Sequence, residues 1–191
     1  MIRQTLRWED LKSGNVQDPM EGLEKFRKLS VQDMLDNIEN THHLTERDQM
    51  EEITALGKEL ELKELRILNR TFLDLKEHLM DHFDKEEQVV FPLMWIYEHP
   101  TAELRILLNE LQNEHRDQER IIRRLTEEMS LLTLSLPKEN AENAADTDAN
   151  VDVTNIRTFM ERIQSLLNDI SEHIMKEDEV LFPKYEENLY L

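Results

Sequence analysis

Cysteine is absent from all 191 residues of this chain. Acting alone, the chain can therefore form no disulfide, zinc–thiolate site or iron–sulfur cluster, and it has no thiol for catalysis. Any metal would have to be bound by its 7 histidines and its carboxylates. Glycine and proline are also scarce, with 3 and 5 residues, whereas residue types that favour helices are abundant. We expect one all-α domain with almost no strand.

Long apolar runs and positive charge are also lacking. No apolar run approaches the ~20 residues of a membrane span, and residues 1–10 contain no stretch that resembles a signal peptide. We therefore expect a cytoplasmic protein that does not enter a membrane. The 23 basic residues face 42 acidic ones, which gives a formal net charge of -19. This charge repels phosphate backbones and anionic lipids, so nucleic acid and membrane surfaces are poor partners.

Turn-forming residues divide the chain into two parts. Residues 1–29 contain breakers at 13–15 and 18–19, followed by a short possible helix at about 20–28. We interpret this part as an N-terminal arm that packs on the main body. The main domain is expected to span residues 30–191.

Capping residues and composition mark the ends of the long helices. Ser30 is a suitable N-cap for a first long helix that ends at about Leu60, and Thr101 is a suitable N-cap for the third. Residues 138–152 are rich in Asn, Ala, Asp and Glu, so we expect a flexible acidic loop there. The last long helix is then expected to begin near residues 154–155.

Apolar residues recur along each long helix in alternating steps of four and three, which places them on one helical face. In the second helix this stripe ends in His82 and Glu86, and in the last helix it ends in His173 and Glu177. His115 interrupts the stripe of the third helix. Four such helices predict an antiparallel, up-and-down four-helix bundle whose stripes face inward. The histidines and glutamates on the stripes would then share one central space.

Each histidine–glutamate pair has the spacing H-x-x-x-E, so its two side chains lie one helical turn apart, about 6 Å. Both pairs belong to a repeated pattern, H-x-x-K-E-[ED]-x-V-[VL]-F-P, which begins at His82 and again at His173. Two iron ions ~3.5 to 4 Å apart need anionic bridging ligands. Glu86 and Glu177 can each supply one oxygen to each ion, so the pattern predicts a di-iron centre.

The repeat also indicates an internal duplication of helix pairs, which predicts one ligand on helix one and one on helix three. On helix three this ligand is His115, although a single histidine on an apolar face is more often a satisfied core residue. Helix one offers two candidates, because His42 continues the stripe from Ile38 and His43 continues the stripe that includes Met50. We favour His43 and keep His42 as the alternative.

Other histidines fit a metal site less well. His78 and His99 lie off the apolar stripes. Ferritin-type oxidases need two helices with an E-x-x-H pair, whereas here only Glu39 and His42 have that spacing. A ferritin-type site is therefore less favoured than the arrangement with two H-x-x-x-E pairs.

These residues resemble the hemerythrin-like HHE cation-binding family, and within it most closely the di-iron proteins for repair of iron centres. The resemblance covers about residues 30–185 and rests mainly on the two H-x-x-x-E-x-x-x-x-F-P segments. It implies a hemerythrin-like bundle that holds two non-haem iron ions, oxo- or hydroxo-bridged. The implied metal ligands are His43, His82, Glu86, His115, His173 and Glu177.

Two features depart from the pattern of these relatives. Oxygen-carrying hemerythrins have a fifth histidine on the third helix, whereas this chain has Leu111 and Glu119 beside His115, so plain oxygen transport is less favoured. Glu119 could reach the site as an extra carboxylate or could pair with a neighbouring arginine at the edge of the stripe. Repair proteins usually begin with a small cysteine-containing domain, and without cysteine no role that depends on such thiols is expected.

The resemblance implies repair of iron–sulfur clusters after oxidative or nitrosative damage, with dioxygen or nitric oxide as the small ligand and iron–sulfur proteins or a redox protein as possible partners. A second hypothesis is a non-enzymatic module that senses or buffers oxygen, nitric oxide or iron. A third is a peroxidase-like or nitric-oxide-reducing enzyme. Steady turnover with a reductant would separate the third from the second, and rescue of a damaged cluster enzyme would separate the first from both.

Overall fold

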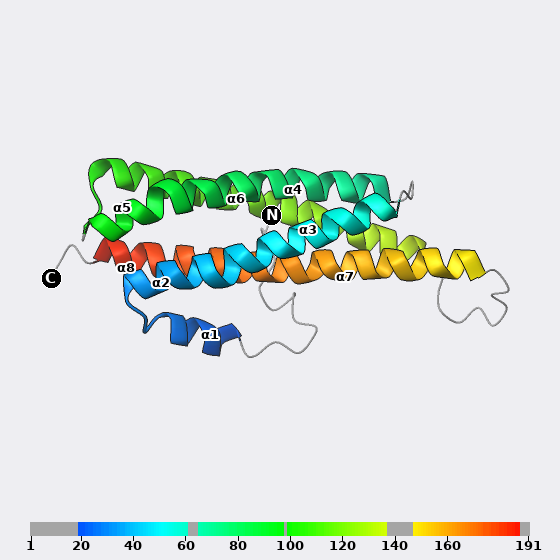
Figure 1. Ribbon diagram of the computed structural model, residues 1–191, viewed down its shortest axis with the longest axis horizontal. Helices are drawn as coiled ribbons and strands as arrows, with labels where there is room; N and C mark the ends of the chain where they lie inside the picture. Colours follow the sequence, from blue (N-terminus) through cyan, green and yellow to red (C-terminus); the bar gives the residue numbers. More distant parts are fainter. Residues whose placement is uncertain (1–18, 61–64, 98, 137–146, 188–191) are drawn as a thin grey trace, which may run out of the picture.

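The computed structural model describes residues 19–60, 65–97, 99–136 and 147–187. The helices form four long rods. These rods run along a common axis, and the short helix α1 lies against the side of one end (Figure 1). Within the described ranges the regular structure is entirely helical. In chain order the elements are α1 (Pro19–Phe26), α2 (Val31–Asn37), η2 (Ile38–His43), α3 (Leu44–Glu59), α4 (Arg66–Lys85), η4 (Glu86–Val90), α5 (Phe91–Ile96), α6 (Ala102–Ser135), α7 (Thr147–Lys176), η5 (Glu177–Leu181) and α8 (Phe182–Glu187).

Three of the four rods contain a π-helical segment. The first rod is α2, η2 and α3, the second is α4, η4 and α5, the third is α6, and the fourth is α7, η5 and α8. Successive rods run in opposite directions, with α4 packed against α6 and α3 packed against α7 (Figure 1). The predicted all-α, up-and-down four-helix bundle is therefore confirmed. No described helix combines the length and the apolar character needed to cross a membrane.

Two predicted helix starts are confirmed by their cap geometry. The Ser30 hydroxyl accepts a hydrogen bond of 3.1 Å from the backbone N–H of Asp33. The Thr101 hydroxyl accepts the equivalent bond, 3.2 Å long, from the backbone N–H of Leu104. Each cap satisfies an N–H group that has no partner inside its helix.

The predicted start of the last helix was wrong. Helix α7 begins at Thr147, whereas the predicted start lay near residues 154–155. Acidic residues are favoured near a helix N-terminus and alanine has the highest helix propensity, so an acidic, alanine-containing sequence is compatible with a helix start as well as with a loop. The rest of the predicted loop, up to residue 146, lies outside the described residues, as do residues 1–18 of the predicted arm.

The buried apolar side chains form two clusters along the bundle axis. The larger cluster is built mainly from α3, α4, α6 and α7 and includes Phe72, Phe83, Phe159, Ile163 and Ile170. The second cluster lies toward α1, α5 and α8 and includes Phe26, Ile38, Leu111, Phe182 and Tyr185. Buried histidines and glutamates come from the stretches of chain between these two clusters. The fold therefore surrounds one polar layer with apolar side chains on both sides.

Candidate metal centre

Three π-helical turns carry predicted ligands. Segment η2 ends at His43, whereas η4 begins at Glu86 and η5 begins at Glu177. A π turn adds one residue to the local helical repeat, so it changes which side chains face the core. Such single-turn π segments inside helices are common at functional sites. Here they occur where the sequence predicts metal ligands.

The repeated F-P dipeptide gives a local reason for two of these turns. Pro92 has no N–H group, and a proline ring crowds the carbonyl four residues before it, which disfavours a regular α turn. The preceding N–H, that of Phe91, bonds instead to the carbonyl of Glu86, five residues earlier. In the second copy of the repeat, the N–H of Phe182 bonds to the carbonyl of Glu177 in the same way.

The six predicted site residues meet in one buried space between the four rods, and each is at most 2% exposed. Glu86 contacts the Nε2 atoms of His43 and His82, at 3.2 and 3.3 Å. Glu177 contacts the Nε2 atoms of His115 and His173, at 3.2 and 3.4 Å. The two halves meet directly, because the Nε2 atoms of His82 and His115 are 3.0 Å apart.

Several of these atoms are buried without a hydrogen-bond partner in the described part of the chain. They are both carboxylate oxygens of Glu86, both of Glu177, and the Nε2 atoms of His43 and His173. Each unsatisfied buried polar atom of this kind costs roughly 1–3 kcal/mol, and more when it is charged. A cation at the centre would satisfy them, so the donor atoms present fit a bound metal.

The donor atoms form two overlapping sets that share one carboxylate. His82, Glu86, His115 and Glu177 have ligand atoms within 4.8 Å of one another, and so do His43, Glu86 and His173. Imidazole nitrogen and carboxylate oxygen together suit iron and several other divalent metals. The centre therefore offers two neighbouring positions for a cation, with Glu86 common to both.

Each of the four histidines also contacts a second, outer carboxylate through its Nδ1 atom. The pairs are His43 with Glu87 at 2.7 Å, His82 with Glu114 at 2.8 Å, His115 with Asp178 at 3.0 Å and His173 with Glu46 at 3.2 Å. An ionised carboxylate can only accept, so each Nδ1 carries a proton and donates it. In a neutral ring this leaves the lone pair on Nε2, which is the tautomer that a metal-binding histidine needs.

Basic side chains hold two of the outer carboxylates in place. Arg47 donates two hydrogen bonds to Glu87, at 2.6 and 3.1 Å. Lys85, the lysine of the repeated pattern, donates to Glu114. These contacts fix the carboxylates, which in turn fix the orientation of the imidazole rings.

No role was predicted for these outer carboxylates, although the sequence contains signals for three of them. Glu87 and Asp178 occupy the same position in the two copies of the repeat, immediately after each central glutamate. Glu46 follows His43 by about one helical turn in the sequence, and the structure buries it fully. Glu114 had no comparable signal, because only the packing of α6 on α4 brings it to His82.

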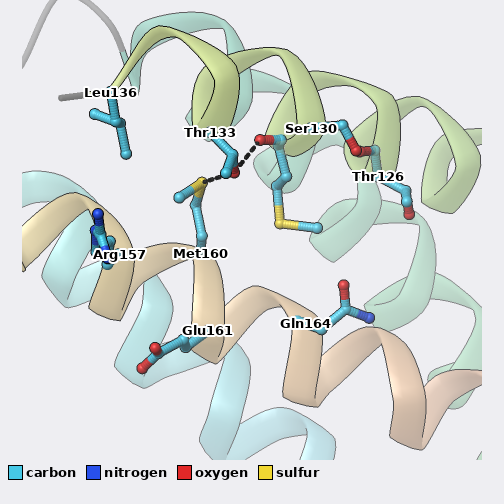
Figure 2. Close-up of a pocket in the computed structure, with 9 residues that line it drawn as sticks. Thr126, Ser130, Thr133, Leu136, Arg157, Met160, Glu161 and Gln164 are labelled. Carbon is cyan, nitrogen blue, oxygen red and sulfur yellow. Dashed lines mark hydrogen bonds between the residues drawn. The ribbon is translucent and has the colours of Figure 1, made fainter. Parts of the chain in front are cut away.

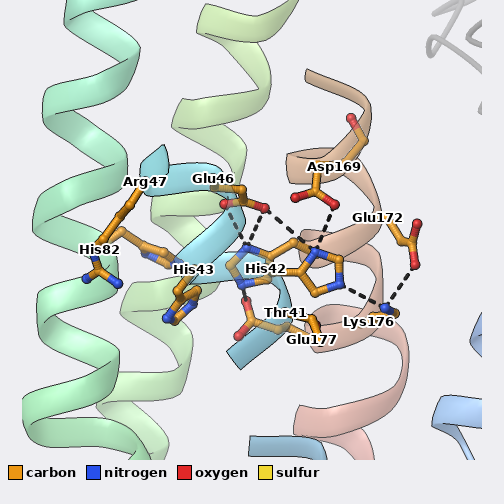
Figure 3. A network of polar contacts seen from close by, with 12 residues as sticks. Thr41, His42, His43, Glu46, Arg47, His82, Asp169, Glu172, Lys176 and Glu177 are labelled. Carbon is orange, nitrogen blue, oxygen red and sulfur yellow. Dashed lines mark hydrogen bonds and ion pairs between the residues drawn. The ribbon is translucent and has the colours of Figure 1, made fainter. Parts of the chain in front are cut away.

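His42 and His43 point to different sides of helix one (Figure 3). His43 faces Glu86, whereas His42 faces α7, where its Nδ1 atom is 3.1 Å from Asp169. Lys176 can only donate, so the Nε2 atom of His42, 2.8 Å away, accepts from it and Nδ1 carries the proton. Both ring nitrogens of His42 are therefore engaged outside the central space.

The π turn η2 explains why the sequence left the choice between these two histidines open. The stripe that starts at Ile38 predicts His42, and the stripe that contains Met50 predicts His43. One extra residue in the turn between Ile38 and His43 accounts for the mismatch of one residue. Both stripes therefore lead to a buried histidine, but only His43 faces the central space.

When no cation is bound, protonated His115 and His173 face an ionised Glu177 in the centre. Burial lowers the pKa of His115, but Asp178 and Glu177 outweigh this effect and raise its pKa to about 10. Burial acts in the same direction on His173, and Glu177 and Glu46 still raise its pKa well above 6.5. Burial disfavours an ionised Glu177, yet His173 and His115 hold the pKa of its carboxyl well below its usual range. A cation would take the place of these protons.

The remaining histidines and Glu119 do not enter the central space. His78, His99 and Glu119 are all exposed. The alternative in which Glu119 supplies an extra carboxylate is therefore not supported by its position. Its neighbour Gln118 is buried instead, with 1% of its surface exposed.

A separate surface groove of about 410 Å³ lies between α6 and α7 (Figure 2). These parts of α6 and α7 belong to the end of the bundle that is far from α5 and α8 (Figure 1). Thr133 and Met160 approach each other across it, with the hydroxyl 3.9 Å from the sulfur. None of the predicted ligands lines this groove. Its lining offers no cluster of metal-binding side chains, so the centre described above is the stronger candidate site.

Comparison with known protein families agrees with this geometry. The family model described as Hemerythrin HHE cation binding domain matches residues 33–185. That range includes every element from α3 to η5 and all six predicted ligands. No curated protein matches the chain.

Proposed function

The chain belongs to the hemerythrin HHE cation-binding domain family, and from this premise we propose that it is a non-haem di-iron protein. The main support for this proposal comes from four carboxylate oxygens. Both oxygens of Glu86 and both of Glu177 are buried without a hydrogen-bond partner among the described residues. Two glutamates so placed fit the bridging positions between two cations, because each carboxylate has one oxygen for each ion.

The proposed ligands divide into two pairs of histidines. His43 and His173 would hold one ion, and His82 and His115 would hold the other, with Glu86 and Glu177 shared between them. The overlap of the two donor sets at Glu86 supports this division. When bound, such an iron pair supplies a redox-active Lewis acid that can accept dioxygen, nitric oxide or a related small ligand.

The rest of the chain prepares the centre in three ways. The outer carboxylates orient the rings and keep Nδ1 protonated, as in the 2.7 Å contact between His43 and Glu87. The two apolar clusters exclude water from both ends of the polar layer. Phe83 stacks on the His43 ring with a centroid distance of 4.3 Å, which restricts rotation of that ring.

For the physiological role, we propose repair of iron–sulfur clusters or a related response to nitric oxide and oxygen stress. The support is the resemblance of both H-x-x-x-E-x-x-x-x-F-P segments to proteins that repair iron centres, together with a buried centre suited to a small ligand. Neither feature identifies the partner protein. The test is whether the iron-loaded protein restores activity to an iron–sulfur enzyme that has been damaged by nitric oxide.

A sensing module is the second candidate, and one contact favours it. Lys176 donates to His42 beside the centre and also lies over the ring of Phe26 in α1, 5.5 Å from the ring centroid. A change in the charge of the centre could therefore alter how α1 packs on the bundle. The test is to measure the rate of amide hydrogen exchange in α1 for the oxidised and for the reduced protein. A sensing role predicts that α1 exchanges more slowly in one of these two states.

Metal analysis together with an optical spectrum tests the di-iron assignment itself. About two irons per chain and the near-ultraviolet absorption of a bridged ferric pair are expected for aerobically purified protein. Full loading with zinc or manganese, or iron without those bands, would contradict the assignment. The metal-free protein gives the baseline for the spectrum.

A further inference from the structure

Gln118 is a buried polar side chain without a hydrogen-bond partner. Only 1% of its surface is exposed, and neither its amide nitrogen nor its amide oxygen makes a hydrogen bond within the described part of the chain. An amide offers two donor hydrogens and two acceptor lone pairs, and burying all of them unsatisfied is costly. Such an exception in a packed core calls for a physical explanation.

The place of Gln118 on α6 predicts which way its amide extends. It follows His115 by three residues on α6, so the two side chains lie on the same buried face, about 5–6 Å apart at Cβ. Side chains on an α-helix lean toward the N-terminus of the helix. We therefore expect the long side chain of Gln118 to lean toward His115, with its amide as the end nearest the centre.

The internal duplication shows what is unusual about this position. His43 and His115 are matching residues, so Gln118 matches Glu46, which also follows its histidine by three residues. Glu46 accepts a hydrogen bond from the Nδ1 atom of His173. In the duplication, His82 corresponds to His173. The Nδ1 atom of His82 donates its hydrogen bond to Glu114 and not to the residue at position 118.

The amide of Gln118 is consequently not used to orient a histidine. We propose that it donates a hydrogen bond to a small exogenous ligand held at the half of the centre formed by His82 and His115. This inference rests on the proposed di-iron function. It further specifies the half of the centre that binds the ligand and the residue that recognises the ligand. The ligand class is a small anion or diatomic molecule whose outer atom carries partial negative charge.

A neutral amide suits this role better than the carboxylate at the matching position. Glu46 is paired with His173, and a second carboxylate at position 118 would repel an anionic or electron-rich ligand. The amide N–H stabilises developing negative charge without adding a charge of its own. The difference between Gln118 and Glu46 therefore makes the two halves of the centre unequal.

Azide is the probe for the test, and Gln118→Met is the main variant because methionine keeps the length of the side chain without its donors. Iron-loaded, oxidised protein is titrated with azide, and the stretching frequency of the bound azide is recorded by infrared spectroscopy. We expect the variant to keep wild-type iron content and to bind azide about fivefold more weakly, as loss of one net hydrogen bond predicts. The stretching frequency should shift at the same time.

Gln164→Met is the matched control. Gln164 lies on α7 in the groove of Figure 2, where its amide bonds to Asn168 at 3.0 Å. This variant should leave azide affinity and frequency unchanged. The melting temperature of metal-free Gln118→Met protein should be equal to or higher than that of the wild type, because an unsatisfied amide has been removed.

Wild-type azide affinity and an unshifted frequency in Gln118→Met would overturn the proposal. So would loss of iron from this variant, since Gln118 would then belong to metal binding, or an equal loss of affinity in Gln164→Met. Gln118→Ala serves for the same comparison if the methionine variant does not fold. Absence of iron from the wild-type protein is a distinct result, which would contradict the di-iron function and this inference with it.

Discussion

The Nε2 atoms of His82 and His115 lie 3.0 Å apart, although the two residues belong to different rods. Each ring already donates its Nδ1 proton to a carboxylate, so a hydrogen bond between the two Nε2 atoms requires an additional proton on one of them. Without a cation, this proton holds the two rings together in the place that a metal would occupy. The metal-free and metal-bound proteins should therefore respond to pH in opposite ways.

The stability of the metal-free protein is expected to fall as the pH rises. The pKa of His115 is raised from 6.5 to about 10, so its contribution to stability is fully present below pH 6.5 and is lost as the pH rises through 10. The raised pKa of His173 acts in the same direction. Melting temperatures of metal-free protein between pH 6 and pH 10 measure this loss. Metal affinity should rise over the same window, because binding releases protons, and a flat melting profile would contradict the prediction.

Replacing a histidine of the centre should remove iron. His82→Ala or His173→Ala leaves one ion with a single histidine, so at least one of two irons per chain should be lost. His78→Ala is the control, because His78 lies one turn before His82 on α4 but is exposed. Iron content is measured after identical loading, and wild-type values in both variants would remove these histidines from the site.

Removing the charge of a central glutamate should weaken both ions together. Glu86→Gln and Glu177→Gln keep the shape of the side chain, but an amide neither screens the repulsion between two cations nor bridges them readily. Both variants should lose the near-ultraviolet bands of the pair, even where some iron remains. Glu179→Gln, at an exposed position in η5, is the control. One tightly held iron per chain would instead indicate that the changed glutamate binds a single ion.

The outer carboxylate Glu114 should affect metal affinity without touching the metal. Burial raises the pKa of Glu114, but hydrogen bonds from His82 and Lys85 outweigh this and lower it to about 2, so the group stays ionised at neutral pH. Glu114→Gln should weaken iron binding by roughly 10- to 100-fold, as is usual for second partners of metal-binding histidines. Competition with a chelator measures the change. Glu110→Gln, one turn earlier and exposed, should have no effect.

The two adjacent histidines of helix one should differ in their effect. His43→Ala should lose iron, because the Nε2 atom of His43 faces Glu86 at 3.2 Å. His42→Ala should retain two irons, since both nitrogens of His42 contact Asp169 and Lys176. The reverse result in metal analysis would assign the ligand to His42 and would show that helix one is rotated in the loaded protein.

The bundle and the residues that face its centre could be predicted from local features of the chain. Alternating steps of four and three place Leu68, Leu75, His82 and Glu86 on one face whatever that face meets, because helical periodicity is a local property of the chain. Cap preferences are equally local, which is why Ser30 and Thr101 were predicted correctly. The start of α7 was missed because an acidic, alanine-containing segment fits both a loop and a helix N-terminus.

The orientation of the imidazole rings and the identity of the outer carboxylates depend on how the rods pack, and the sequence does not predict them. His173 and Glu46 are separated by 127 positions in the chain, and whether they touch depends on how far each rod is rotated about its axis. The π turn at Ile38–His43 changes that rotation by one residue, and it separates His43, which faces the centre, from His42, which does not. Local periodicity carries no information on the rotation of one helix against another, because that angle is fixed by the packing of side chains between rods.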